Sequence, residues 1–450
     1  MKIVIAGDGD TGHYLAKQLS RENFDIVMLG LDSAKLADYD LRYNILTMEG
    51  EATSPTALRR AGVPKSDLFV GVTPSENANL VAAEIAKAMG VVKTVARIDT
   101  REFLTPEYSG IFSSRGVDTM VYPEYLAAKE IEVVLDHPWL TKLYTLHRGE
   151  VSLAVVQVPG GSRIEGMKLK DFASLGRNFH ISAIRRGMHT IIPTGQDDIM
   201  ARDVVYFTYA RNSGAEESIM DLCGKKQLDV KRVLIIGGGK ITNLLLEQIG
   251  QDRRVTVIEP DRARCRILAE RFPQATIVNG DFRELETLRE EGLDCADAFV
   301  ALTPSSETNI VTSMVARDCG VPITIAEIED FQYFNEATAL NIGSVINKKL
   351  LTSSMIYEML LDSMMLKAPS FVDLEEAEVL EIVVGDGAKV TRSAVRDLDL
   401  PEGMTIGALV RDGRGMLVDG GTRIQPGDHV VVFYAGGFVS RIQKYFKEKH

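Results

Sequence analysis

Short apolar runs alternate with amphipathic segments along most of the chain. The first run, Ile3 to Ala6, leads into a glycine-dense loop in the stretch MKIVIAGDGDTG, and further runs follow at 26–29, 45–48, 68–72, 95–98 and 120–122. Helical patterns separate them, for example SENANLVAAEIAKAMG between Ser75, a residue typical of helix starts, and Gly90, a typical helix stop. Strands that alternate with helices predict βαβ units and a parallel sheet.

The same pattern returns in the second half of the chain. Apolar runs stand at 233–236, 255–258, 276–278, 298–302, 323–325 and 344–346, and the loop sequence RVLIIGGGKIT repeats the arrangement of strand, glycine turn and helix. Identical residues recur at an offset of 230: Gly7 and Gly237, Gly50 and Gly280, Thr73 and Thr303, Pro74 and Pro304, Asn79 and Asn309, Gly90 and Gly320, Val91 and Val321. The chain is therefore predicted to be a tandem duplication.

Each copy continues into a smaller lobe of short strands. Residues 152–158, 181–186 and 204–209 correspond to 379–384, 406–411 and 429–434, with turn signals at ARD and PGD. The predicted fold class is α/β, a tandem duplication of a Rossmann-like doubly wound parallel sheet, each copy followed by a small α+β lobe. The predicted boundaries are 1–122 (N-lobe 1), 123–140 (crossover helix 1), 141–213 (C-lobe 1), 214–230 (linker), 231–346 (N-lobe 2), 347–366 (crossover helix 2) and 367–450 (C-lobe 2).

The two crossover helices carry apolar residues on more than one face. Leu126, Ile131 and Leu135 in the first copy, like Leu351 and Ile356 in the second, give each helix more apolar surface than its own sheet would cover. We predict that these helices form an interface, with dimerisation as the expected use. The alternative is packing on their own domain alone.

Both glycine loops are candidates for binding a dinucleotide. A strand that runs into closely spaced glycines and then a helix lets the backbone approach a pyrophosphate at the helix N-terminus. The first loop holds Gly7, Asp8, Gly9, Asp10, Thr11 and Gly12, and the second holds Gly237, Gly238, Gly239, Lys240 and Ile241. One such motif is weak evidence, and two at equivalent places are much stronger.

The two loops depart from the dinucleotide fingerprint in complementary ways. The ribose-binding acid expected about twenty residues later is Glu259 in the second copy, whereas Gly30 stands there in the first and Asp32 is the nearest acid. Asp32 either substitutes for it or caps the next helix. Asp10 would repel phosphate and Lys240 would attract it, and Thr242 replaces the third glycine. We expect two non-equivalent sites.

Other candidate residues follow strands at the same edge of each sheet. Thr73 with Pro74, and Thr303 with Pro304, end the fourth strands and are expected to line the ligand or to serve turn chemistry alone; Glu51 and Asp281 follow the third strands. Arg97 is expected to reach phosphate oxygens. Its counterpart in the second copy is Glu327, which argues against a phosphate contact there.

Composition excludes several classes of function. A formal net charge of −12 and a pI near 5.3 disfavour a nucleic-acid-binding protein. The apolar runs are too short for a membrane span or signal peptide, so a cytosolic protein is expected. The cysteines lack metal or disulfide spacing, and the seven histidines are scattered, so neither a metal site nor a catalytic constellation is predicted.

The GDGDTG loop, the TPSEN loop, the VARI strand, the crossover helix and the small C-lobe, repeated in tandem, resemble the TrkA family over the whole length. The resemblance implies a cytosolic, non-enzymatic regulatory subunit with two RCK units, a ring assembly that is commonly tetrameric, and a membrane-embedded potassium-translocating partner. It implies NAD(H) as ligand, with ATP or ADP open, especially at the first site. It assigns Gly7 to Thr11, Thr73, Pro74 and Arg97 to the first nucleotide site, and Gly237 to Ile241, Glu259, Thr303 and Pro304 to the second.

Two other functions remain as alternatives. One is an NAD-dependent oxidoreductase with duplicated Rossmann domains, which would show substrate-dependent changes in NADH absorbance. A redox-sensing DNA-binding repressor is disfavoured by the acidic charge and by the missing recognition-helix motif.

Overall fold

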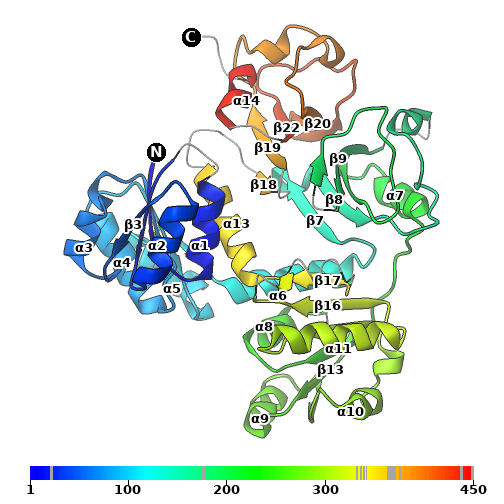
Figure 1. The fold of residues 1–450 in the computed structure, drawn as a ribbon. Helices are drawn as coiled ribbons and strands as arrows, with labels where there is room; N and C mark the ends of the chain where they lie inside the picture. Colours follow the sequence, from blue (N-terminus) through cyan, green and yellow to red (C-terminus); the bar gives the residue numbers. More distant parts are fainter. Residues whose placement is uncertain are drawn as a thin grey trace. The chain divides into compact units, whose positions relative to one another are not determined.

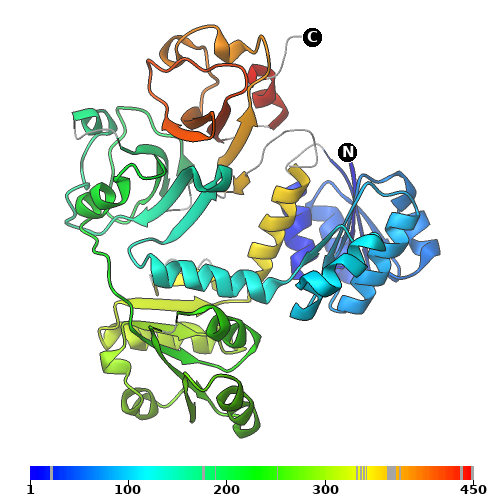
Figure 2. The same cartoon turned by 180° about the vertical axis from the view of Figure 1, so that it is seen from behind.

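The chain folds into two compact units, each assembled from two separate stretches. The computed structural model describes residues 1–20, 24–174, 178–187, 189–250, 252–330, 333–334, 337, 340, 342–361, 371–373, 377–435 and 439–446. Unit 1 comprises Met1–Asp136 and Asp229–Tyr357, and unit 2 comprises His137–Leu228 and Glu358–His450. Figures 1 and 2 show the course of the chain from opposite sides.

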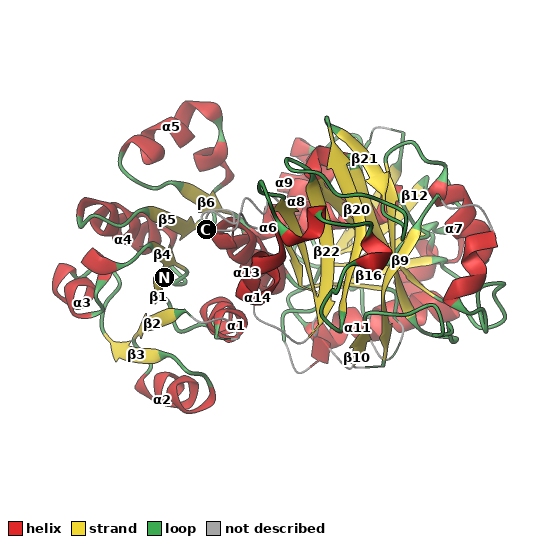
Figure 3. Ribbon diagram, turned by 90° about the horizontal axis from the view of Figure 1, so that it is seen from above, coloured by secondary structure: helices red, strands yellow, loops and turns green. Residues whose placement is uncertain are grey.

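The first half of unit 1 is a six-stranded parallel sheet with the order β3-β2-β1-β4-β5-β6. Helices cover both faces, with α1 and α2 on one and α3 and α4 on the other (Figure 3). Apart from Lys2 at the start of β1, the central strands are apolar because both faces are buried. The elements are β1 (Lys2–Ala6), α1 (Asp10–Leu19), β2 (Asp25–Gly30), α2 (Ser33–Arg42), β3 (Leu46–Glu49), α3 (Pro55–Arg60), β4 (Leu68–Gly71), α4 (Glu76–Ala88), β5 (Lys93–Arg97), α5 (Pro106–Ser114) and β6 (Thr119–Val121).

The second half of unit 1 repeats this topology as β14-β13-β12-β15-β16-β17. The duplicated, doubly wound parallel sheet predicted from the sequence is confirmed. Its elements are β12 (Arg232–Ile236), α8 (Lys240–Gln248), β13 (Arg254–Glu259), α9 (Arg262–Arg271), β14 (Thr276–Asn279), α10 (Leu285–Glu290), β15 (Ala298–Ala301), α11 (Ser306–Asp318), β16 (Ile323–Glu327) and β17 (Ser344–Ile346).

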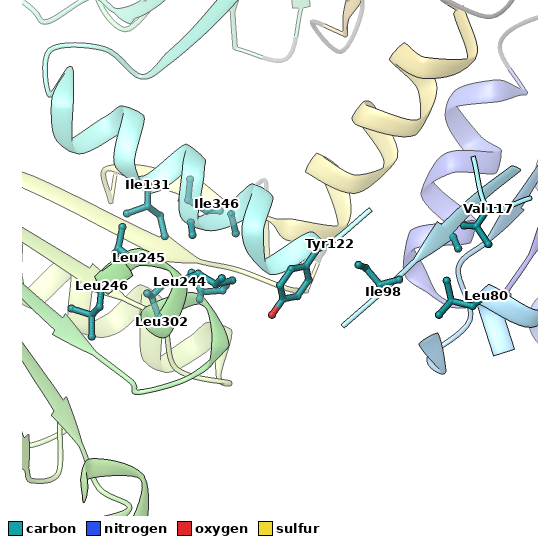
Figure 4. Close-up of a cluster of buried hydrophobic side chains, with 14 of the residues drawn as sticks. Leu80, Ile98, Val117, Tyr122, Ile131, Leu244, Leu245, Leu246, Leu302 and Ile346 are labelled. Carbon is teal, nitrogen blue, oxygen red and sulfur yellow. The ribbon is translucent and has the colours of Figure 1, made fainter. Parts of the chain in front are cut away.

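The first crossover helix, α6 (Pro123–Asp136), packs on the second lobe rather than on the first alone. Ile131 and Leu135 are buried in a core that also contains Leu244 and Leu245 of α8 (Figure 4). At the end of α6, Arg253 Nη2 donates to Asp136 Oδ1 at 2.6 Å. The extra apolar face of this helix is therefore covered by the other copy within the same chain.

The second crossover helix, α13 (Lys348–Leu361), contacts the first lobe in return. Lys349 Nζ lies 2.6 Å from Asp10 Oδ2, and Ser353 Oγ donates to the carbonyl oxygen of Thr11 at 3.4 Å. The two copies thus exchange contacts through their crossover helices. Residues 362–366, which we expected to extend the second helix, lie outside the described residues.

Unit 2 consists of two antiparallel sheets with the orders β10-β9-β11-β8-β7 and β18-β19-β22-β20-β21. Val155 and Tyr206 of one sheet share a buried apolar cluster with Val379, Val431 and Phe433 of the other. The strands are β7 (Lys142–Leu146), β8 (Val151–Gln157), β9 (His180–Arg186), β10 (His189–Ile191), β11 (Val204–Ala210), β18 (Phe371–Asp373), β19 (Ala377–Val383), β20 (Met404–Arg411), β21 (Arg414–Leu417) and β22 (His429–Ala435).

Equivalent arginine–aspartate pairs brace the two sheets. Arg186 donates two hydrogen bonds, of 3.0 and 2.8 Å, to the buried carboxylate of Asp203. Arg411 donates two, of 2.8 and 2.7 Å, to that of Asp428. Each arginine also reaches a nearby backbone carbonyl. The ARD and PGD turns found in the sequence thus place an acid at the start of the last long strand of each lobe.

The segment 214–230 is not a linker throughout. It contains helix α7 (Ala215–Cys223), whose Ile219 and Leu222 are buried in the core of the first C-lobe. The first residues of the helix are polar, and its buried apolar residues begin only at Ile219, so the start of this segment resembles a linker in sequence. In addition, the first C-lobe contains a 3₁₀ segment, Leu169–Ser174.

Replacing Leu245 by alanine tests the packing of α6 on α8. Leu245 is fully buried, so we expect the free energy of unfolding to fall by about 2–5 kcal/mol because a cavity remains at the junction of the lobes. The matched control is Leu41→Ala, which removes the same atoms from an 87% exposed position and should change stability by less than about 0.5 kcal/mol. Urea denaturation followed by circular dichroism measures both. Equal effects of the two substitutions would contradict this account of the junction.

Candidate functional site

The glycine loop of each lobe lies against the loop that follows the fourth strand. Because β1 pairs with both β2 and β4, the strand order reverses beside Gly7, the point where open α/β sheets bind ligands. Gly7 has a φ of +134°, and a Cβ there would lie 2.7 Å from the backbone of Val72. Gly237, with a φ of +94°, approaches the carbonyl oxygen of Leu302 in the same way. Only glycine permits both the conformation and the close approach.

The helices after these loops begin with amides that no side chain caps. Gly9 precedes α1 and Gly239 precedes α8, with φ values of −76° and −77°, and neither residue offers a capping oxygen. A Cβ at either position would meet nothing within 4 Å. Both helix N-termini therefore present open backbone N–H groups, an arrangement that suits a phosphate.

Beside each glycine loop, in the region called here the crevice of each lobe, one carboxylate accepts hydrogen bonds from two backbone amides, but the two carboxylates belong to different elements. In the first lobe, Asp8 of the glycine loop accepts hydrogen bonds from the amides of Leu31 and Asp32 at 2.7 and 2.6 Å. In the second, Glu259 at the end of β13 accepts from the amides of Gly238 and Asp261 at 2.7 and 2.9 Å.

Steric exclusion explains this exchange. Asp8 is equivalent to Gly238, and Gly30 is equivalent to Glu259. A Cβ at Gly30 would lie 2.5 Å from the Asp8 carboxylate, and a Cβ at Gly238 would lie 2.7 Å from Leu268 Cδ1 and 3.1 Å from Glu259 Oε2. At this pair of positions, each lobe therefore has one acid and one glycine. The first lobe thus has a carboxylate at this place, that of Asp8, although the sequence spacing did not reveal it.

Asp32 caps the next helix, α2, which is one of the two roles that the sequence suggested for it. Its Oδ1 accepts from the amides of Ala34 and Lys35, both at 3.1 Å, and so caps α2. Asp261 caps α9 in the same way in the second lobe. Asp32 is thus a helix cap whose own amide is held by Asp8.

Thr242 does not disturb the second loop. Its hydroxyl donates to the carbonyl oxygen of Gly237 at 2.5 Å, whereas a Cβ at the equivalent Gly12 would collide with the carbonyl oxygen of Gly7. Ile241 is buried in the core, so only its backbone faces the loop. The third glycine is needed in one copy, and a threonine that satisfies the same carbonyl suffices in the other.

Asp10 is not an uncompensated negative charge in the first loop. Lys349 of the second copy lies 2.6 Å from its carboxylate and also donates to the carbonyl oxygen of Glu329 at 3.4 Å. Lys240 of the second loop reaches back to the carbonyl oxygen of Asp99 in the first lobe at 3.4 Å. Each loop thus has a lysine near it, and each lysine bridges the two copies. Sequence spacing gave no signal for the first bridge, since its partners are 339 residues apart.

The Thr-Pro loops are held by a buried asparagine. Asn309 Oδ1 accepts from the amide of Thr303 at 3.0 Å and from its hydroxyl at 2.7 Å, and its amide group donates to the carbonyl oxygens of Thr303 and Glu327. Asn79 makes the same four bonds around Thr73. The threonine hydroxyls therefore serve the loop, and Pro74 and Pro304 are exposed. In the sequence, only the recurrence of this asparagine at equivalent positions, Asn79 and Asn309, indicated that it holds the loop.

Arg97 and Glu327 occupy equivalent strand ends with opposite charges. Arg97 Nη2 pairs with Asp99 at 2.8 Å, so its guanidinium is already engaged. Glu327 is buried, which raises its pKa, and it lies 3.3 Å from Lys348. Against the effect of burial, Glu327, Glu329 and Glu124 together raise the pKa of Lys348 above its ordinary value. The side chain of Glu327 is thus taken up by its ion pair with Lys348.

The acids that follow the third strands of the two sheets are Glu51 and Asp281. Glu51 is exposed. Asp281 is bound by Arg283 through bonds of 2.9 and 2.6 Å, and these hydrogen bonds lower the pKa of Asp281 to about 2. A ligand at the second site would meet this ion pair rather than a free carboxylate.

His13 is a packing residue in this structure. Its ring stacks on Tyr39 with centroids 4.5 Å apart, and Nε2 lies 2.9 Å from the hydroxyl of Tyr43. Burial lowers the pKa of His13.

The four cysteines, Cys223, Cys265, Cys295 and Cys319, form no disulfide. Within the described residues, no helix is long and apolar enough to cross a membrane.

Two parallel-sheet lobes with glycine loops at the switch point, each followed by an antiparallel β lobe, define a class of tandem nucleotide-fold proteins. The TrkA-N domain model matches residues 3–123 and 233–348, and the TrkA-C domain model matches 153–216 and 379–447. The chain belongs to the TrkA family.

Similar proteins match along the whole chain. The Trk system potassium uptake protein TrkA of Halomonas elongata is 30% identical over 444 residues, covering 96% of this chain and 95% of the relative. Its namesake from Vibrio alginolyticus is 30% identical over 456 residues, with 99% of each covered.

Among solved structures, the RCK domain of GsuK matches with a TM-score of 0.61 and 14% identity, covering 99% of this chain and 94% of that one. The GsuK channel bound to NAD matches with a TM-score of 0.61 and 15% identity, covering 99% and 78%. At these identities the likeness concerns the fold alone.

Replacing Asn309 by alanine tests how the Thr-Pro loop is held. The amide of Thr303 would lose its acceptor, and we expect its hydrogen exchange to accelerate at least tenfold, with about 1–3 kcal/mol of stability lost. Exchange detected by mass spectrometry on peptides around residue 303 measures the effect. Asn44→Ala at an exposed position serves as control. Unchanged protection of Thr303 in the Asn309 variant would show that another group holds the loop.

Proposed function

We propose that the chain is a nucleotide-binding regulatory subunit of a Trk-type potassium uptake system and is not an enzyme. The relatives that match nearly its whole length are named Trk system potassium uptake protein TrkA. Because the match spans both copies and both kinds of lobe, the shared architecture is the whole two-copy chain rather than one common domain.

The observation that carries the nucleotide proposal is the pair of crevices. Each combines open helix amides after Gly9 or Gly239 with a carboxylate beside the loop, Asp8 or Glu259. Amides suit the pyrophosphate, and a carboxylate in this region suits ribose hydroxyls. We propose NAD(H) as a ligand, with ATP or ADP as the further candidates, especially at the first site. Arg97, Thr73 and Thr303 remain proposed rim residues.

Regulation by such a ligand requires differential binding and no covalent chemistry. A nucleotide shifts a conformational equilibrium only as far as its affinity differs between the two states. In unit 1, the first glycine loop is tied through Asp10 and Lys349 to α13 of the second copy. A phosphate near Asp10 would change the charge balance at this contact. The ligand would thereby act on the junction between the copies.

We further propose that the chain forms a homo-oligomeric ring, expected to be a tetramer. This ring would lie on the cytoplasmic face of a membrane-embedded potassium-translocating subunit. Co-purification with that subunit and mass photometry of the complex test the assembly. A protein that bound neither NAD(H) nor ATP or ADP, and that failed to associate with a Trk-type membrane subunit, would refute the proposal. Substrate-dependent oxidation or reduction of the nucleotide would favour an oxidoreductase instead.

Alanine at Gly9 or at Gly239 separates the two sites. Both positions have ordinary φ values and open space around a Cβ, so both variants should fold normally. The added methyl group would stand where a pyrophosphate approaches the backbone. We expect each variant to lose one nucleotide-binding event, with affinity at that site reduced at least tenfold. Calorimetric titration of NADH, NAD, ATP and ADP measures this loss.

Gly160→Ala in unit 2 is the matched control, since its Cβ would also meet nothing within 4 Å. Unchanged thermal unfolding of all three variants would confirm that binding alone is altered. Retention of both events in the Gly9 and Gly239 variants would place the nucleotides elsewhere.

Replacing Lys349 by methionine tests the charge balance at the first loop. Without this cation, the carboxylate of Asp10 would repel phosphate, so affinity at the first site should fall about 3- to 10-fold, or roughly 1 kcal/mol. The second site provides an internal reference and should be unaffected. Lys17→Met, which removes an exposed charge from the last turn of α1, controls for net charge. Equal weakening by both substitutions would indicate a general field effect.

A further inference from the structure

A carboxylate lies at the apolar contact between the two sheets of unit 2. Along β19, Ala377 and Val379 face the cluster shared with the first C-lobe, and alternation places Glu381 on the same side. The side chain of Glu381 is fully buried. A buried carboxylate is costly unless it is paired, so the groups around it require an explanation.

Two histidines meet Glu381 at one oxygen atom. His147 Nδ1 lies 2.5 Å from Glu381 Oε1, and His429 Nδ1 lies 2.9 Å from the same atom. The imidazole rings are 4.5 Å apart between centroids. His147 belongs to the first C-lobe, whereas Glu381 and His429 belong to the second. One nitrogen or oxygen from each of the three residues can be chosen so that all three atoms lie within 4.8 Å of one another.

The duplication shows that the fold does not need these polar groups. The position of Glu381 on β19 corresponds to Val155 on β8, and that of His429 on β22 corresponds to Val204 on β11. Both valines are buried in the same cluster. A pair of apolar residues in one sheet is thus a carboxylate and an imidazole in the other, which indicates a purpose other than packing.

His147 is held in place by an unusual turn. It lies between β7 and β8 with a φ of +46°, followed by Arg148 at +55° and Gly149 at +88°. Two successive non-glycine residues in the left-handed region are energetically unfavourable, and such conformations persist where the surroundings fix them. Here the turn directs the imidazole towards the other lobe.

We propose that His147, Glu381 and His429 bind a divalent transition-metal ion of the zinc class, which joins the two C-lobes. Two imidazoles and one carboxylate are a donor set typical of Zn²⁺, with a fourth position for water. Bonds of about 2.0–2.1 Å to a tetrahedral ion separate the donor atoms by about 3.3 Å, so small side-chain rotations suffice. Both histidines are partly exposed, at 22% and 31%, which gives the ion and its water a route from solvent.

The sequence could not reveal this site. The histidines lack metal-binding spacing, and His147 is separated from Glu381 by 234 residues. The site is independent of the nucleotide crevices, all of whose residues lie in unit 1. Its test therefore does not depend on the proposed function.

Calorimetric titration of ZnCl₂ and CoCl₂ into the full chain, stripped of metal with EDTA and desalted, tests the proposal. We expect one site per chain with submicromolar affinity for Zn²⁺ and a rise in the thermal midpoint on binding. MgCl₂ should give no such site, because Mg²⁺ prefers an all-oxygen shell. The Co²⁺ form should show visible d–d bands without a thiolate charge-transfer band.

The decisive variant is Glu381→Val with His429→Val, which installs the valines found in the other sheet and should keep the lobes packed. We expect its Zn²⁺ affinity to fall at least 100-fold, and that of His147→Ala at least tenfold. Glu381→Gln, which keeps the size of the side chain, provides the same test if the double variant fails to fold. His189→Ala and Cys295→Ser should bind as the wild type does.

Two results would overturn the proposal. Zn²⁺ binding that persists unchanged in the variants would place the ion at other residues. Absence of submicromolar Zn²⁺ binding in the folded wild type would show that the three residues form a hydrogen-bonded group only.

Discussion

The burial of α6 against α8 joins the two copies into one core. Helix α6 leaves the last strand of the first sheet with more apolar surface than that sheet covers, and Ile131 and Leu135 are buried beside Leu244 and Leu245 of the second lobe. Burial of each such side chain contributes about 1.5–3 kcal/mol. The ionic contacts between the copies depend on this junction to bring their partners into range.

The two crevices follow one plan but have exchanged their charged residues. Asp8 and Glu259 arise from different elements and hold the equivalent amides of Asp32 and Asp261. Steric exclusion accounts for the exchange, since the glycine in each crevice leaves room for the acid opposite. The acid approaches the glycine loop from a different side in each lobe, so the two lobes offer a ligand different surroundings.

In unit 2, the duplicated sheets share their braces but differ at their contact. Arg186 with Asp203, and Arg411 with Asp428, preserve the strand starts in both lobes. At the apolar contact, by contrast, Glu381 stands where the other sheet has a valine. The common scaffold is set by local pairing, and the differences lie where the two copies meet. At the contact between the two copies, a duplicated protein can combine side chains from both, which a single copy cannot do.

The sequence by itself determined the duplication, the parallel sheets and the glycine loops. Each depends on a local pattern. Short apolar runs mark buried strands, and capping residues such as Ser75 mark helix starts. The glycines of the loops have a positive φ or a close backbone approach that no other residue permits. The recurrence of Asn79 as Asn309 also marked a residue whose role only its four hydrogen bonds explain. Tertiary structure decided the rest. A pattern shows which face of α6 is apolar but not which lobe covers it. No local rule brings Lys349 to Asp10 or His147 to Glu381, since these contacts close over hundreds of residues and arise only when the lobes pack.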